Sequence, residues 1–300
     1  MNGSTQRSLV VRAGERAGDG TELRITPEAA GWRFSGLAVL TLAPGESRAW
    51  ATEESETLVL PLEGSCTVRD GAETIELAGR RDVFSGPTDF AYVPRDAEVT
   101  ISSETGGRFA LPSARCEHRL PLRHQPADRV PVELRGAGRA SRQVNNFCTP
   151  EAFDADALIA CEVLTPGGNW SSYPPHKHDE ATDTETELEE IYYFEVAPGP
   201  GGPGLAYQRV YASPGHDVDV LAEVRSGDVV LIPHGWHGPS MAVPGYDLYY
   251  LNVMAGPGPE RAWRISDDPA HAWIRETWAG EDVDPRLPFG AAGRGQEEGR

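Results

Sequence analysis

Turn-forming residues recur through the first 130 positions, and this regularity constrains the fold more than any other feature of the sequence. Glycine- and proline-containing steps such as Glu63-Gly-Ser and Gly86-Pro-Thr separate short segments that are rich in alternating apolar residues. Strands are predicted at 36–42, 56–63, 66–69, 90–94 and 98–102, with almost no helical periodicity between them. Short strands joined by tight turns are typical of an antiparallel sandwich or barrel.

A second series of strands follows a crossover at 121–142 that is rich in Pro, Arg and Gly. Its predicted members are 157–165, the segment around His176, 190–196, 205–211, 217–224, 229–233 and 247–255. The two series both consist of short strands separated by turn residues, but they show no detectable repeat of individual residues. The sequence therefore predicts two similar all-β domains, at 1–130 and 131–289.

The C-terminal region departs from this pattern. Trp273, Ile274 and Trp278 recur at helix-like spacing, which predicts a short helix within 266–279 that packs on a barrel. Residues 290–300 are rich in Gly, Glu and Arg and contain no apolar anchor, so we expect a disordered tail.

Composition limits the partners. The net charge of -19 argues against nucleic acid or an anionic membrane surface as a ligand. No apolar run is long enough for a transmembrane helix, and the N-terminus lacks the apolar stretch of a secretory signal. The four cysteines lie far apart without a C-x-x-C pair, which favours reduced thiols in a cytoplasmic protein: Cys66, Cys116, Cys148 and Cys161.

The residues that indicate chemistry begin with His176 and His178. Residues i and i+2 of a strand point to the same face, so the two imidazoles can converge on one point, as a transition-metal site requires. Glu190 begins a segment rich in β-branched and aromatic residues, which we expect to return as the second strand of a hairpin. A further imidazole follows the strand at 229–233, in His237. Three imidazoles and a carboxylate on β-structure predict a metal site with open positions.

Alternatives exist for two of these ligands. Glu185, Glu187 and Glu189 compete with Glu190, and the acidic run that contains them is by default a solvated loop. Glu190 is preferred because it adjoins the apolar strand, where a carboxylate is held in place. His234 competes with His237, and the histidine pair could also be a surface feature.

Lys177 is the only lysine in the chain and lies between the two candidate ligands. A basic side chain near the metal would suit an anionic metabolite. Strand parity, however, directs Lys177 away from the face that His176 and His178 share. Direct contact with a substrate is therefore one hypothesis for this residue, and a position on the opposite face is the other.

At these residues the chain resembles the cupin superfamily. Its first motif pairs two histidines one residue apart with a following glutamate, which here comes after a longer gap. Its second motif corresponds to Gly227, Pro233, Gly235 and His237, with one residue fewer before the histidine and without the closing asparagine. A closer match, over 165–179, 189–194 and 244–256, resembles the 5-deoxy-glucuronate isomerase family of inositol catabolism and its sister, 4-deoxy-L-threo-5-hexosulose-uronate ketol-isomerase. The likeness extends over nearly the whole chain.

The resemblance implies a bicupin, two antiparallel jelly-roll barrels of which only the second binds a divalent metal. His176, His178, Glu190 and His237 would be the ligands, and the sequence leaves Zn, Mn, Fe and Ni open. The implied reaction is the aldose–ketose isomerisation of 5-deoxy-D-glucuronate to 5-dehydro-2-deoxy-D-gluconate. We expect a cytoplasmic homo-oligomer that acts on a small-molecule uronate.

Such a reaction moves a proton from C2 to C1, through an enediolate that the metal would stabilise. Candidates for the base are Glu190, Tyr192, Tyr250 and a hydroxide on the metal, although both tyrosines could simply pack in the barrel. Arg142 and Lys177 are candidates for binding the substrate carboxylate. Two other functions fit a cupin: an Fe(II) dioxygenase, which would consume oxygen, and a sugar-binding protein without catalysis.

Overall fold

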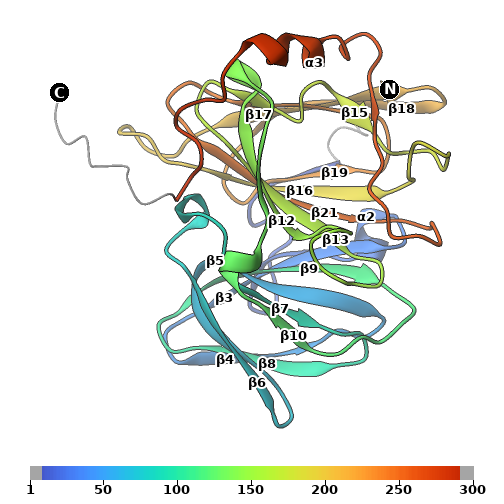
Figure 1. Cartoon of the computed structure of the whole chain (residues 1–300). Coiled ribbons are helices and arrows are strands. Elements are labelled where there is room, and N and C mark those ends of the chain that lie inside the picture. Colours follow the sequence, from blue (N-terminus) through green and yellow to red (C-terminus); the bar gives the residue numbers. More distant parts are fainter. Residues whose placement is uncertain (1–8, 291–300) are drawn as a thin grey trace.

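The computed structural model describes residues 9–290, which form three antiparallel β-sheets. The first, called here the N-terminal sheet, has nine strands and makes up the lower part of the molecule in Figure 1, coloured from blue to green. Its strands are β2 (Thr21–Ile25), β3 (Ser35–Leu42), β4 (Glu46–Ala51), β5 (Ser55–Asp70), β6 (Glu73–Arg80), β7 (Phe90–Val93), β8 (Glu98–Ser103), β9 (Gly107–Arg115) and β10 (Arg123–Gln125).

The other two sheets form the upper part of the molecule (Figure 1). The central sheet has seven strands, in the order β1 (Val10–Val11), β19 (Val229–Ile232), β16 (Glu189–Val196), β21 (Leu248–Ala255), β13 (Ile159–Thr165), β12 (Arg142–Cys148) and β11 (Val132–Arg135). The outer sheet has the order β18 (His216–Val224), β17 (Ala206–Ser213), β20 (Trp236–Ala242), β15 (His176–Lys177) and β22 (Ser266–Asp267), and β14 (Trp170–Ser171) also pairs with β20.

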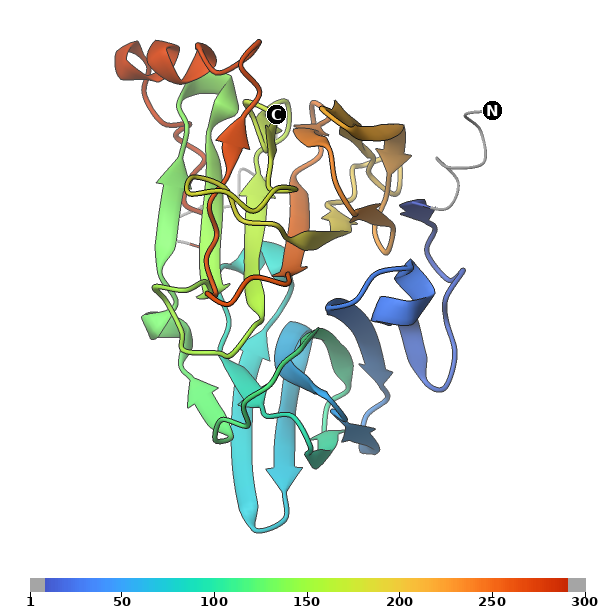
Figure 2. The same ribbon diagram turned by 90° about the vertical axis from the view of Figure 1, so that its right-hand side faces the viewer.

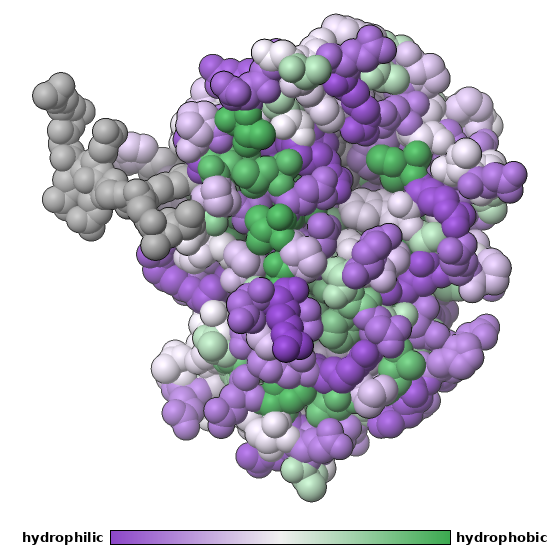
Figure 3. Space-filling view, viewed as in Figure 1, coloured by the Kyte–Doolittle hydropathy of each residue, from purple (hydrophilic) through white to green (hydrophobic). Residues whose placement is uncertain are grey.

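Helices are few and short in the described part of the chain. They are α2 (Pro27–Ala30) and α3 (Ile274–Thr277), with 3-10 turns η1 (Val83–Ser85), η2 (Ala127–Arg129), η3 (Gly138–Ala140) and η4 (Trp278–Gly280). None of the helices in 9–290 has the length and apolar character needed to cross a bilayer. The face of the molecule in Figure 3 is largely hydrophilic, with hydrophobic residues gathered in small patches.

The central sheet is buried on both faces, except at its edge strand β11. Along β21, Tyr249 and Leu251 pack toward the N-terminal sheet, whereas Tyr250 and Met254 pack toward the outer sheet. Because successive residues of a strand point to opposite faces, a strand covered on both sides must be apolar at nearly every position. This explains the continuous apolar segments of the second half of the sequence. A third apolar cluster fills the interior of the N-terminal unit, between β3, β5 and β9 and the strands β4, β6 and β8.

Two glutamates join the N-terminal sheet to the central sheet in a reciprocal way. The carboxylate of Glu56, at the start of β5, accepts the backbone N–H groups of residues 156–158 at 2.6–2.9 Å. The carboxylate of Glu189, at the start of β16, accepts the N–H groups of residues 33–35 at 2.7–3.1 Å. Each charge therefore satisfies backbone donors of the other half, and these bonds fix where β3 and β13 begin.

A buried ion pair makes a third connection. Arg80, at the end of β6, forms two bonds of 2.8 Å to the carboxylate of Glu162 on β13. Arg80 also donates to the carbonyl oxygens of Pro61 and Gly86, and Asn145 donates to Glu162 at 2.6 Å. Both charged side chains are almost fully buried, with exposed fractions of 3% and 0%. The bidentate geometry and the extra partners offset the cost of removing the two charges from water.

The first strand, β1, belongs to a different sheet from the strands that directly follow it in the chain. β1 pairs with β19 at the edge of the central sheet, beside the upper half in Figure 2. All later strands up to β10 belong to the N-terminal sheet, and the strands from β11 onward belong to the other two sheets. The division of the chain near residue 130 into two domains stays a prediction.

Several local expectations need correction. The predicted strands 56–63 and 66–69 are one strand, β5, because Gly64 adopts a φ of +83° and the register shifts beside it, which bends the strand without ending it. The expected hairpin between the histidine pair and Glu190 is wrong, since β15 and β16 lie in different sheets. Strand β20 was not predicted, because Gly238 and Pro239 interrupt its pattern.

The C-terminal helix is confirmed but shorter than predicted, because β22 occupies the start of the expected segment. Ile274 is buried, whereas Trp273 is 60% exposed and does not anchor the helix. The four cysteines are buried and unpaired, as expected. The predicted disordered tail is 290–300; Gly290 lies in a turn, and residues 291–300 lie outside the described residues.

The Arg80–Glu162 pair provides a test of how the two halves are held together. Replacing Arg80 by methionine (Arg80→Met) leaves the Glu162 carboxylate buried without a cation. We expect the free energy of unfolding to fall by about 3–5 kcal/mol in chemical denaturation. Arg81 is the matched control, because its side chain is 83% exposed and pairs with its chain neighbour Asp82. Arg81→Met should cost less than about 1 kcal/mol, and an Arg80→Met protein as stable as the wild type would contradict the assignment.

Candidate metal centre and cavity

Three histidines converge between the central and outer sheets. His176 on β15 lies directly opposite His237 on β20 in the antiparallel pairing, and their ring centroids are 4.4 Å apart. His178 follows β15, and its ring is 4.7 Å from that of His237. The ligand atoms of the three side chains lie within 4.8 Å of one another.

Glu190 reaches the same point from the opposite sheet. It lies on β16, and its Oε2 is 3.0 Å from Nε2 of His178 and 3.1 Å from Nε2 of His237. Its other oxygen accepts a hydrogen bond from Nδ2 of Asn252, which holds the carboxylate in place. The predicted set of His176, His178, Glu190 and His237 is therefore brought together, although not by a hairpin.

Backbone carbonyls orient two of the imidazoles. Nδ1 of His178 lies 3.2 Å from the carbonyl oxygen of Leu188, and Nδ1 of His237 lies 3.1 Å from that of Gly235. A carbonyl oxygen can only accept, so each Nδ1 carries the hydrogen and each Nε2 faces the centre of the group. Hydrogen bonds of this kind fix ring orientation in metal-binding histidines.

The donor set fits a divalent transition metal. Nε2 of His237 is buried without a hydrogen-bond partner, since its contact with Glu190 is close but poorly aligned. Burial lowers the pKa of His176, which favours the neutral imidazole that a metal needs. Burial alone would raise the pKa of Glu190, but its hydrogen bond with His178 and the nearby His237 lower that pKa, so the carboxylate is anionic. Burial alone would lower the pKa of His178, but the same hydrogen bond raises it, and a metal would displace the proton from Nε2 of this ring. Three imidazole nitrogens and one carboxylate oxygen suit Zn, Mn, Fe and Ni.

The competing residues have other roles. Glu185 accepts hydrogen bonds from Lys177 and from backbone N–H groups, Glu189 binds residues 33–35, and Glu187 is exposed. His234 stacks on His216 with ring centroids 4.7 Å apart, away from the three histidines. The acidic run is therefore not simply a solvated loop.

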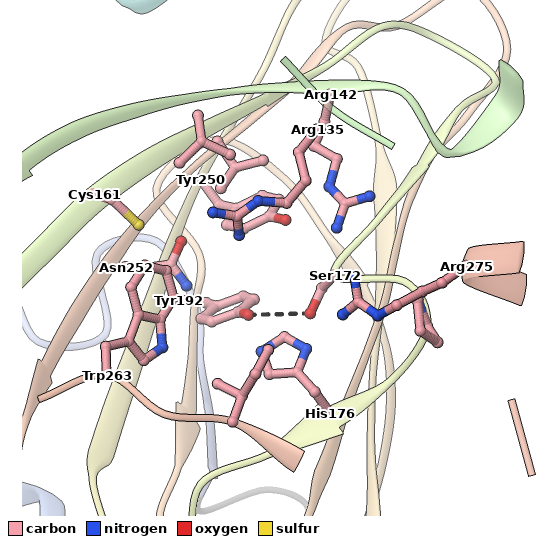
Figure 4. Close-up of a pocket in the computed structure, with 14 residues that line it drawn as sticks. Arg135, Arg142, Cys161, Ser172, His176, Tyr192, Tyr250, Asn252, Trp263 and Arg275 are labelled. Carbon is pink, nitrogen blue, oxygen red and sulfur yellow. Dashed lines mark hydrogen bonds between the residues drawn. The ribbon is translucent and has the colours of Figure 1, made fainter. Parts of the chain in front are cut away.

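A cavity of about 220 Å³ opens beside His176 (Figure 4). The rings of Tyr192 and Tyr250 stack in its wall at 4.9 Å, and the Tyr192 hydroxyl lies 3.2 Å from Oγ of Ser172. Burial raises the pKa of Tyr250 to about 12. The lining residues with polar or aromatic side chains are Arg135, Arg142, Cys161, Ser172, His176, Tyr192, Tyr250, Asn252, Trp263 and Arg275.

Three arginines line the cavity. Arg135 pairs with Glu133 at 2.7 Å, and Arg275 pairs with Asp267 at 2.7 Å. Arg142 is buried, donates to the carbonyl oxygen of Ala140 and faces the Trp278 ring, and it has no carboxylate partner within the described residues. Burial, together with repulsion from the other two arginines, lowers the pKa of Arg142 to about 10. One positive charge is thus left over beside the candidate metal centre.

Lys177 does not reach this cavity. Its side chain is buried on the other side of β15, with Nζ 2.7 Å from Asp179 and 2.8 Å from Glu185. The structure therefore provides no support for a contact between Lys177 and a substrate, since its ammonium group is already satisfied by carboxylates.

Comparison with known proteins places this arrangement in a family. The model of the KduI/IolB family matches residues 9–274. The chain belongs to the KduI/IolB family.

Curated relatives of this KduI/IolB-family chain are enzymes. A 5-deoxy-glucuronate isomerase of Geobacillus kaustophilus (strain HTA426) is 41% identical over 262 residues, which cover 86% of this chain and 92% of the relative. The enzyme of that name from Bacillus subtilis (strain 168) is 39% identical over 241 residues, covering 79% and 86%. The family member described here is therefore an isomerase, an intramolecular oxidoreductase.

Solved structures agree with the fold. The crystal structure of an IolB-like protein from Salmonella typhimurium LT2 matches with a TM-score of 0.81 and 36% identity, covering 89% of this chain and 98% of that one. An oxalate decarboxylase of Lactobacillus farciminis matches with a TM-score of 0.61 at 12% identity, covering 86% and 88%. The second likeness concerns the fold alone. The prediction of an all-β bicupin is confirmed for this KduI/IolB-family chain.

Sequence reasoning missed four residues of the site in this family member. Asn252 carried a signal, as an isolated amide in the apolar strand β21. Arg135 and Arg275 carried none, because arginine is abundant throughout the chain and their approach depends on how β11 and α3 lie against the sheet. Ser172 lies between β14 and β15, and no pattern in that segment indicated that its side chain would face the cavity.

Proposed function

We propose that this chain is a metal-dependent aldose–ketose isomerase that converts 5-deoxy-D-glucuronate to 5-dehydro-2-deoxy-D-gluconate, as a cytoplasmic homo-oligomer in inositol catabolism. The observation that carries the proposal is the joint geometry of the site: three imidazoles and Glu190 meet beside a cavity in which the Arg142 guanidinium has no carboxylate partner among the described residues. The names of the curated relatives support the same substrate.

His176, His178, Glu190 and His237 would hold the metal. When bound there, a divalent cation supplies Lewis acidity for a carbonyl and an adjacent hydroxyl oxygen. Glu190 serves as a ligand rather than as the base, because its lowered pKa makes the carboxylate a weak proton acceptor and Asn252 occupies one of its oxygens.

The two tyrosines act through their hydroxyl groups. With a pKa of about 12, Tyr250 keeps its proton at neutral pH and can donate a hydrogen bond to a substrate oxygen that gains negative charge. Tyr192 lies beside Ser172, and this pair of hydroxyls can both accept and donate. Tyr192 is therefore suited to move the hydroxyl proton between O2 and O1 of the substrate without becoming charged.

Arg142 would bind the substrate carboxylate. Glu133 and Asp267 neutralise Arg135 and Arg275, so the cavity offers one net positive charge to a ligand with one carboxylate. A guanidinium can bind a carboxylate with two parallel hydrogen bonds, which fixes the direction in which the sugar lies relative to His176.

Metal affinity tests the ligand assignment. We expect His237→Ala to weaken the binding of Zn²⁺ and Mn²⁺ by at least about 100-fold, since loss of outer partners alone costs about 10–100-fold. Competition with a chelator measures the affinity, and elemental analysis of the purified protein measures occupancy. His234→Ala is the matched control, because His234 stacks on His216 outside the site. Equal affinities in the two variants would contradict the assignment.

Steady-state kinetics test the role of Arg142. We expect Arg142→Met to lower kcat/KM about 10- to 100-fold, mainly through a higher KM, because a hydrogen bond to a charged group is worth about 1.5–3 kcal/mol. Arg139→Met is the control, since Arg139 lies in the same segment but is exposed. An unchanged KM for Arg142→Met would show that the carboxylate binds elsewhere.

The reaction itself is tested by NMR in deuterated water with 5-deoxy-D-glucuronate. We expect a ketose product with deuterium at C1, because a proton removed from C2 exchanges with solvent before it returns. Treatment with a chelator should abolish turnover, and added metal should restore it. Absence of any product from the metal-loaded protein would remove the isomerase assignment, and uptake of oxygen would favour a dioxygenase.

A further inference from the structure

The sole lysine of the chain is part of a buried network that the proposed reaction does not use. The side chain of Lys177 is only 6% exposed, and its Nζ contacts Oδ1 of Asp179 at 2.7 Å and Oε1 of Glu185 at 2.8 Å. Glu180 contributes a third, half-exposed carboxylate at 3.2 Å, and the ring of Trp236 lies 5.6 Å from the amine. Two buried carboxylates therefore depend on one buried ammonium group.

The first arm of this network leads to His237. The second oxygen of Asp179 accepts the backbone N–H of Gly235 at 2.9 Å and the hydroxyl of Ser213 at 2.5 Å. The carbonyl oxygen of the same Gly235 accepts Nδ1–H of His237 at 3.1 Å. A continuous series of contacts thus runs from the ammonium group of Lys177, through Asp179 and one peptide segment, to the imidazole of His237.

Gly235 has to be a glycine in this series. Its φ is +96°, and a Cβ there would lie 2.7 Å from the carbonyl oxygen of Tyr211 and 2.5 Å from Cγ1 of Val218. The segment has therefore little freedom to move toward β17 and β18. The direction in which the Gly235 carbonyl points then depends on the hydrogen bond from the Gly235 N–H to Asp179.

The second arm leads to His178. Oε1 of Glu185 accepts Lys177 Nζ together with the N–H groups of Asp179 and Glu180, at 2.9 and 3.0 Å. These bonds fold the acidic segment back onto β15. At the end of the segment, the N–H of Leu188 donates to the His178 carbonyl at 2.9 Å, and the Leu188 carbonyl accepts Nδ1 of His178.

We infer that Lys177 is a positioning residue of the metal centre, which orients His237 through Asp179 and Gly235 and orients His178 through Glu185 and the segment 179–188. The inference rests on the proposed function, in which both histidines are metal ligands. Lys177 lies on the opposite side of β15 from the histidines, so it supports the centre without touching the substrate.

Mutation of the network should change the metal affinity of the folded protein. The double variant Lys177→Met/Glu185→Gln removes one cation and one anion together, and we expect it to bind Zn²⁺ and Mn²⁺ about 10- to 100-fold more weakly. Asp179→Asn is the second variant, for use if the first does not fold. An asparagine has one acceptor oxygen, so it cannot serve both Lys177 and Gly235, and the same loss is expected. Lys177→Arg keeps the cation and should recover most of the affinity.

A readout independent of the metal is the tautomer of His237, measured by ¹⁵N NMR of the imidazoles in the metal-free protein. We expect the Nδ1–H form to dominate in the wild type and in Lys177→Arg, and to lose population in the network variants. Arg108→Met is the matched control, because Arg108 also joins two carboxylates, Glu22 and Glu195, at 2.8–2.9 Å but has no connection to the histidines. It should lower stability without changing either readout.

The outcomes separate the inference from the proposed function. A folded Lys177→Met/Glu185→Gln or Asp179→Asn protein with wild-type metal affinity and an unchanged His237 tautomer would overturn the inference, while His237→Ala still loses the metal. If His237→Ala itself binds metal like the wild type, the metal centre of the proposed function fails instead.

Discussion

The structure depends on burying a β-sheet on both of its faces. The central sheet packs against the N-terminal sheet on one side and the outer sheet on the other, so its strands, apart from the edge strand β11, have almost no position that faces water. Any charge placed there must be matched, because an unpaired buried carboxylate costs several kcal/mol. Two of its buried carboxylates face opposite sides of the sheet, and a third, that of Glu195, pairs with Arg108. Glu162 faces the N-terminal sheet and is matched by Arg80, and Glu190 faces the outer sheet and meets the histidines.

The buried carboxylates on the two sides of the sheet, Glu162 and Glu190, are matched in different ways. On the Glu162 side the cation belongs to the chain, and the result is a permanent connection between two parts of the fold. On the Glu190 side the surrounding groups are imidazoles, which release any proton on the ligating nitrogen to solvent when a metal binds. Burial fixes the geometry of these side chains and leaves a cavity in which the guanidinium of Arg142 makes no ion pair with a carboxylate of residues 9–290.

The acidic segment before Glu190 shows why local composition can mislead. Read as a run of Asp, Glu and Thr, it predicts a solvated loop. In the folded chain Asp179, Glu185 and Glu189 each hold backbone N–H groups, and only part of the segment faces water. Side-chain chemistry was the same in both descriptions. The sequence did not show where the backbone N–H donors of these carboxylates lie, because they come from strands and turns as distant in sequence as Gly235 and residues 33–35.

The sequence by itself predicted the fold class and proposed His176, His178, Glu190 and His237 as side chains that converge. Period-two patterns and turn residues are local properties, so the all-β architecture could be predicted, and the spacing of His176 and His178 places both rings on one side of any extended segment. The tertiary structure decided the rest. It put β15 and β16 in different sheets, directed Lys177 into a carboxylate network, and brought Arg135 and Arg275 to the cavity beside Arg142. These outcomes follow from which surfaces pack together, and packing between segments far apart in the chain leaves no periodic signal in the residues themselves.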